Sequence, residues 1–146
     1  MKTRIKGEDG VFVHASDIQL LDTEAVEAIA AWQPDVVLAS GPALYSDSLS
    51  PQQQQRAWAN GVRLARSVNT LILDHHLLRS EEGLDRLEHL ASETGGNVLC
   101  GADFMGYVRC LLEARRVELY EEIPVPEGWH AAYAMGEADV GAFTRE

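Results

Sequence analysis

Four short apolar runs alternate with longer segments whose apolar residues recur at helical spacing. Each run is too short for a helix and has the length of a buried strand. The runs are residues 11–15, 36–39, 71–73 and 98–100. Strand and helix patterns that alternate in this way predict right-handed crossovers. The sequence therefore predicts an α/β fold built on a largely parallel β-sheet with alternating helices.

The start of each helix carries a local signal. Asp22 or Thr23 is expected to cap the first helix, and Ser80 the third. The segment Ser50-Pro51-Gln52-Gln53 predicts the second helix start, with a serine cap, a first-turn proline and a glutamine that reaches back. A last helix is expected to follow Gly101. Its apolar stripe is predicted to be Phe104, Tyr107, Val108, Leu111 and Leu112.

The chain is predicted to hold one α/β domain over residues 1–122, because 146 residues are one domain's worth of chain. Residues 123–146 are expected to form an irregular C-terminal extension, with Pro124 and Pro126 near its start. Trp129 and Tyr133 lie in this extension, so we expect it to pack against some other surface.

Polar residues follow several of the predicted strands. They are Asp17, Ser40-Gly41, Asp74-His75-His76 and Asp103. The carboxyl ends of parallel strands share one edge, which is where open α/β sheets bind ligands, so these residues are expected to line one crevice. Asp103 also suits a helix cap, and Gly41 followed by Pro42 suits a plain turn better than a ligand cradle.

Carboxylate and imidazole groups at one edge suit a divalent transition metal. Zinc is the first choice, with manganese or iron as alternatives. His14 is predicted to lie near this site as a supporting or a structural residue. His75 and His76 are consecutive, and residues of an extended strand point to opposite faces. We therefore expect only one of the two rings to face an ion.

Charge and composition narrow the choice of partners. The formal net charge is −11, which argues against binding nucleic acid through its phosphates. Cys100 and Cys110 lack metal-type spacing and indicate reduced thiols in the cytoplasm. No stretch is apolar enough and long enough to cross a membrane.

Two motifs carry a resemblance to a known family. They are Val13-His-Ala-Ser-Asp-Ile-Gln19 and Leu71-Ile-Leu-Asp-His-His-Leu-Leu-Arg79. With these motifs the sequence resembles an uncharacterised family of predicted metallo-hydrolases with the metallo-β-lactamase fold. The resemblance matches Asp17 to the bridging metal ligand and His75 to the last metal-binding histidine. It also sets Arg79 over an arginine of the tRNA 3′-processing endonucleases.

Further roles follow if His75 is the ligand. Asp74 or a backbone carbonyl is expected to orient the His75 imidazole, while His76 packs toward the following helix or forms a hydrogen bond within the interior. The family's His-x-His-x-Asp-His motif does not occur in this sequence. The chain is thus expected to correspond to the C-terminal half of the metallo-β-lactamase αββα sandwich. It would contribute the bridging Asp and last His of a dinuclear metal site, with no residue assigned as catalytic.

A half-fold of this kind has two consequences. Metal binding by the isolated chain should be weak or absent. Hydrolase activity would require a partner that carries the His-x-His-x-Asp-His motif and completes the metal site. The apolar sheet face that such a half exposes requires a partner. That partner is either a second copy, giving a homo-oligomer, or a separate chain with the N-terminal half.

Two other functions are open. The chain could be a non-catalytic α/β interaction or oligomerisation domain that keeps the scaffold alone. Asp74-His75-His76 also resembles the motif of the Asp-His-His phosphoesterases. The upstream Asp-x-Asp of those enzymes is absent.

Overall fold

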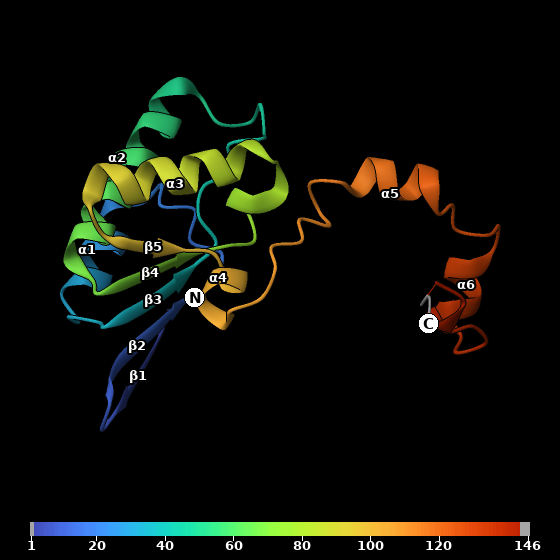
Figure 1. Cartoon of the computed structure of the whole chain (residues 1–146), viewed down its shortest axis with the longest axis horizontal. Helices are drawn as coiled ribbons and strands as arrows, with labels where there is room; N and C mark the ends of the chain where they lie inside the picture. The colour runs from blue at the N-terminus through green and yellow to red at the C-terminus, as the bar shows by residue number, and fades with distance from the viewer. Residues whose placement is uncertain (1, 144–146) are drawn as a thin grey trace.

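The computed structural model describes residues 2–143 and contains one five-stranded sheet (Figure 1). Its strands are β1 (Thr3–Gly7), β2 (Gly10–Ala15), β3 (Val36–Ala39), β4 (Thr70–Leu73) and β5 (Asn97–Leu99). They lie in sequence order, with β1 antiparallel to β2 and all other neighbours parallel. The predicted α/β fold with a largely parallel sheet is confirmed.

Three long helices connect the parallel strands, and shorter helices follow them. The long ones are α1 (Thr23–Ala30), α2 (Pro51–Ser67) and α3 (Glu82–Thr94). The short ones are the 3₁₀ helix η1 (Leu77–Arg79), α4 (Gly101–Met105), α5 (Arg116–Glu122), α6 (Trp129–Ala134) and the 3₁₀ helix η2 (Val140–Phe143). Because the strands follow each other in order with crossovers of one hand, α1, α2 and α3 lie on the same face of the sheet (Figure 1).

The core lies between that face and the three helices. Alternate strand residues point into it because side chains of a strand alternate between faces. The buried strand residues are Val13, Ala15, Val37, Ala39, Leu71, Leu73 and Val98. They meet helical residues that include Val26, Ile29, Leu64, Leu87 and Leu90, all at most 3 % exposed. Each such leucine or isoleucine contributes roughly 1.5–3 kcal/mol by leaving water.

On the opposite face of the sheet, Ile72 of β4 is buried, but the part formed by β1, β2 and β3 lacks a matching layer within the described residues. Phe12, Val36 and Leu38 are only half-buried there, and His14 is exposed. Ile5, which pairs with Phe12, is 57 % exposed. Helix α4 contacts β4 at one end of the sheet and covers no more of this face (Figure 1). We call the surface formed by Ile5, Phe12, His14, Val36 and Leu38 the open sheet face.

Local capping signals place two helices as predicted. Asp22 accepts hydrogen bonds from the backbone N–H groups of Glu24 and Ala25 and so caps α1. Ser50 and Gln53 form a reciprocal capping box at the start of α2, with Pro51 in its first turn. Both signals depend on residues within one turn, so they act without tertiary context.

Three other elements differ from the prediction. Strand β1 was not expected. Ser80 does not cap the third helix, whose N-cap is Glu81 without a side-chain bond. A helix begins at Gly101 as predicted, but α4 is shorter than the predicted helix, because Gly106 ends it in a left-handed conformation with φ of 70°. Phe104, Tyr107 and Val108, expected in a buried stripe, are exposed.

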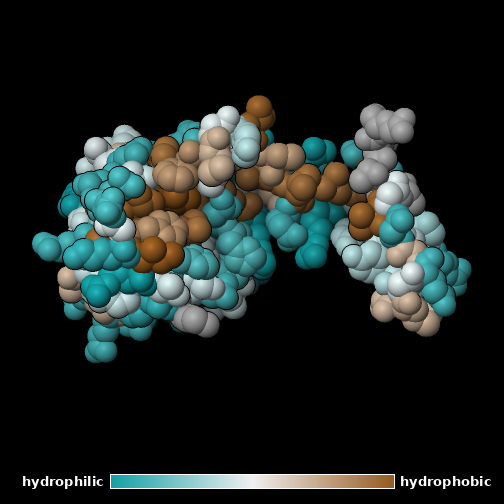
Figure 2. Space-filling view, turned by 90° about the horizontal axis from the view of Figure 1, so that it is seen from below, coloured by the Kyte–Doolittle hydropathy of each residue, from teal (hydrophilic) through white to brown (hydrophobic). Residues whose placement is uncertain are grey.

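The chain after Gly106 leaves the sheet and carries α5 and α6 away from it (Figure 1). Exposed apolar residues run along this segment (Figure 2). They include Val108, Leu112, Val117 and Tyr120. In the predicted extension, Trp129 stacks on Tyr133 with ring centroids 4.9 Å apart. Residues 144–146 of that extension lie outside the described residues. No described helix combines the length and apolarity needed to cross a bilayer.

Candidate metal centre

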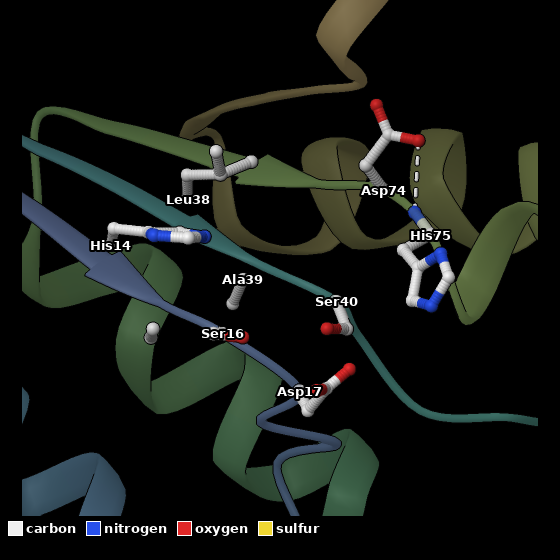
Figure 3. Close-up of a pocket in the computed structure, with 9 residues that line it drawn as sticks. His14, Ser16, Asp17, Leu38, Ala39, Ser40, Asp74 and His75 are labelled. Atoms are coloured by element: carbon white, nitrogen blue, oxygen red, sulfur yellow. Dashed lines mark hydrogen bonds between the residues drawn. The ribbon is translucent and has the colours of Figure 1, made fainter. Parts of the chain in front are cut away.

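A pocket of about 460 Å³ lies at the carboxyl ends of β2, β3 and β4 (Figure 3). It is lined by His14, Ala15, Ser16, Asp17, Leu38, Ala39, Ser40, Asp74 and His75. The strand ends therefore bring the predicted polar residues of β2, β3 and β4 to one edge, as the parallel topology requires.

Asp17, His75 and His76 gather at this edge, with one ligand atom of each within 4.8 Å of the others. Asp17 follows β2 and the two histidines follow β4, so β3 lies between the strands that carry them. Oδ1 of Asp17 lies 3.5 Å from Nε2 of His76. The rings of His75 and His76 are 4.5 Å apart, centroid to centroid.

The expectation that only one imidazole can face the site is wrong. Strand β4 ends at Leu73, and His75 has a φ of 32°, so the chain has left the extended conformation where side chains alternate. Asp17 also has a positive φ, of 49°. Such conformations cost a non-glycine residue of order 1 kcal/mol or more and gather at functional sites. In this chain the positive φ values of Asp17 and His75 bring both imidazole rings close to the Asp17 carboxylate. His76 therefore faces the site as well as the interior.

Asp74 does not take the expected role beside the His75 ring. Its two carboxylate oxygens accept hydrogen bonds from the backbone N–H groups of His75 and Gly101, each at 2.8 Å. The dashed line in Figure 3 marks the first of these, and the carboxylate points away from the imidazole. Asp74 thus fixes the turn after β4 and joins it to the start of α4.

Arg79 contacts the ring of His75 directly. Its Nη2 lies 3.2 Å from His75 Nε2, and its Nη1 donates to the hydroxyl of Tyr45 at 3.2 Å. Both contacts connect η1 and the loop after β3 to the site. Tyr45 was not predicted as a site residue, and nothing in its spacing along the sequence indicates this contact.

His76 is shielded by its surroundings, with 15 % of its side chain exposed. Its Nδ1 is buried and makes no hydrogen bond. Burial lowers the pKa of His76 most, and the neighbouring His75 and Arg79 lower it further, although Asp17 opposes them. A neutral imidazole keeps a lone pair for a metal ion.

The other predicted residues divide between the pocket and the scaffold. His14 is exposed on the open sheet face and lines the pocket. Gly41 is buried with a φ of 71°, and a Cβ there would lie 2.9 Å from Leu77 Cβ, so its place is a tight turn. Asp103 completes a capping box with Cys100 at the start of α4 and pairs with Arg109. The pKa of Asp103 is lowered from 3.8 to about 2, chiefly by the hydrogen bond from Arg109.

The three donors fit a transition-metal site by type, and Asp17 and His76 fit it also by spacing. One carboxylate and two imidazoles are ligands that zinc accepts in catalytic sites. Donors at 2.0–2.1 Å from a tetrahedral zinc ion lie about 3.3 Å from each other. The 3.5 Å separation of Asp17 and His76 is close to this value. The 4.8 Å spread of the full set is wider and suits either a small closing movement or a carboxylate that bridges two ions.

Sequence comparisons relate the chain to part of longer proteins. It is 54 % identical over 140 residues to a UPF0282 protein of Methanosarcina mazei, a match that covers 96 % of this chain and 46 % of the relative. It is 41 % identical over 122 residues to a UPF0282 protein of Methanopyrus kandleri, covering 82 % of this chain and 41 % of the relative. No protein-family profile matches the chain, and no solved structure does. The chain is thus similar to UPF0282 proteins and spans less than half the length of these curated relatives.

Proposed function

We propose that the chain forms part of a metal-dependent hydrolase of the metallo-β-lactamase superfamily, with Asp17, His75 and His76 as ligands of a divalent metal, zinc first. The observation that carries this proposal is the gathering of these three donors within 4.8 Å at the carboxyl edge of the sheet. The two motifs that resemble the metallo-hydrolase family meet at this point. A metal bound here would lower the pKa of a coordinated water toward neutrality and supply a nucleophile.

The chain's own residues would hold and tune the ion. The side chain of Asp17 is 72 % exposed and carries a carboxylate. This carboxylate can bind one metal ion or bridge two. Burial and the neighbouring His75 and Arg79 lower the pKa of His76, which favours the neutral imidazole that a metal ion needs. Asp74 holds the backbone of His75 in its turn, which fixes the direction of that ligand.

We also propose that this chain holds only part of the site. Its three donors are spread more widely than those of one tetrahedral ion, and the exposed Asp17 leaves one side of the edge open. The remaining ligands would come from a second copy or from a separate chain seated on the open sheet face. The greater length of the relatives supports a larger assembly. The free thiols of Cys100 and Cys110 suit the cytoplasm as its location.

A second candidate function is a non-catalytic interaction domain. The half-buried residues of the open sheet face and the exposed apolar residues after Gly106 favour it. The two candidate functions predict different metal affinities, because an interaction domain does not need to bind a metal ion at the carboxyl edge of the sheet.

Zinc titration of the purified chain tests the metal centre. Competition with a weak chromophoric chelator should show low-affinity zinc binding, weakened about 10-fold or more by His75→Ala and by His76→Ala, the scale at which even outer ligand partners matter. His89→Ala is the matched control, since His89 is exposed on α3 away from this edge. Zinc affinity that all three variants leave unchanged would refute the metal centre and favour the interaction domain.

A further inference from the structure

Arg79 contacts the imidazole of His75, one of the proposed metal ligands. Its Nη2 lies 3.2 Å from Nε2 of the imidazole, and its Nη1 is held by the hydroxyl of Tyr45. Arg79 lies four residues after His75, at the end of η1.

The chemistry of the two groups fixes the direction of the hydrogen bond between Arg79 and His75. A guanidinium has donors and no acceptor, so Arg79 must donate and His75 Nε2 must accept. The ring proton of a neutral His75 is therefore on Nδ1. The single lone pair of the imidazole is thereby committed to Arg79.

A metal ion needs that same lone pair. Binding at Nε2 displaces the Arg79 N–H directly. Binding at Nδ1 moves the ring proton to Nε2, where it faces another donor and the contact is lost. Whichever nitrogen binds, His75 cannot hold Arg79 and a metal ion together.

We propose that Arg79 competes with the metal ion for His75 and so sets the metal affinity of this site. The inference rests on the proposed metal centre and adds a residue that opposes loading. The positive charge of the Arg79 guanidinium also repels a divalent cation that binds to His75. The Tyr45 hydroxyl keeps a hydrogen bond to Arg79 when the arginine leaves the ring, so withdrawal does not strand the charge.

Arg79→Met is the test variant, because methionine keeps an unbranched apolar stem and removes both the charge and the donors. Chelator competition should show zinc affinity tightened by about 5-fold or more, since a like charge is removed from the site. Arg63→Gln is the charge-matched control, as Arg63 pairs with Glu27 on the exposed surface of α1 and α2. It should leave zinc affinity unchanged. Unchanged or weaker zinc binding by Arg79→Met would overturn the proposal.

A second measurement needs no variant. Nitrogen-15 NMR of the metal-free chain should show His75 with its proton on Nδ1 and an unprotonated Nε2. A ring protonated on Nε2 would overturn the proposal. If zinc binding depends on His75 but not on Arg79, the proposed competition between Arg79 and the metal ion is wrong and the metal centre stands. If neither the unaltered chain nor Arg79→Met binds zinc, the metal centre itself is wrong as well.

Discussion

Asp17 Oδ1 lies 3.5 Å from His76 Nε2, although β3 separates the strands that carry them. This contact depends on two residues that leave the extended conformation, Asp17 itself and His75. The carboxylate is exposed, while the imidazole is largely buried. The pair therefore presents a carboxylate to solvent with an imidazole nitrogen beneath it.

Asp17→Asn should weaken zinc binding about 10-fold or more, because the amide keeps the shape but loses the charge that holds a cation. The melting temperature should stay nearly unchanged, since exposed substitutions alter stability by only about 0.5 kcal/mol. Chelator competition and thermal unfolding measure the two effects. Asp47→Asn in the exposed loop before α2 is the control. Equal zinc affinity in both variants would remove Asp17 from the ligand set.

The isolated chain should form a dimer through its open sheet face, because an apolar surface of this kind is buried in a stable assembly. Ile5→Lys should give a monomer, since it places a charge on the exposed part of that face. Val117→Lys on α5 changes a similarly exposed residue away from the sheet and should leave the dimer intact. Light scattering at micromolar concentration distinguishes these states. A monomeric unaltered chain would count against the prediction.

The isolated chain should show no turnover of phosphodiester or β-lactam substrates with added zinc or manganese. Its three donors are too widely spread to fix one ion in a single geometry, and an ill-fixed ion activates water poorly. Spectrophotometric assays of the unaltered chain, with Asp17→Ala as the blank, measure this. Robust turnover that Asp17→Ala abolishes would show that the site is complete within the chain.

Local signals predicted those parts of the fold that local interactions determine. The capping box of Ser50 and Gln53 lies within one turn, and the apolar run of β4 is buried whatever its neighbours are. Strand β1 was missed because all its residues are exposed and pair only with β2. The last helix was overextended because the left-handed Gly106 ends α4, and the apolar periodicity beyond it faces solvent.

The candidate site was predicted at the level of strand ends but not of side chains. The topology brings Asp17 and His75 to one edge, which the order of strands and helices already implies. The approach of His76 depends on the positive φ of His75, for which a histidine gives no sequence signal. The contact of Tyr45 with Arg79 joins a loop to η1 and is likewise tertiary.

Gly41→Ala should destabilise the chain by about 2 kcal/mol or more, because alanine resists a φ of 71° and its Cβ would press on Leu77 Cβ at 2.9 Å. Gly106→Ala is the matched control, with a φ of 70° and open space around the added Cβ. It should cost only about 1 kcal/mol of strain. Urea unfolding measures both. Equal losses would show that packing against Leu77 contributes nothing.

Arg109→Gln should destabilise the chain in a pH-dependent way through Asp103. The Arg109 hydrogen bond is the largest cause of the depressed Asp103 pKa, about 2 against an ordinary 3.8. A carboxyl group with a depressed folded-state pKa adds stability that is fully present above pH 3.8 and is lost as the pH falls through 2. The loss on substitution should be about 1 kcal/mol at pH 6, reduced by solvent screening of a partly exposed pair.

That difference should shrink between pH 4 and pH 2, where Asp103 becomes protonated in both proteins. Urea unfolding at pH 6, 4 and 2.5 measures the trend. Arg115→Gln is the control, because Arg115 pairs with Glu118 at a more exposed site, where solvent screening leaves little effect on the free energy of unfolding. A loss for Arg109→Gln that stays constant from pH 6 to pH 2.5 would show that the arginine acts through packing or Glu88 instead of through the Asp103 charge.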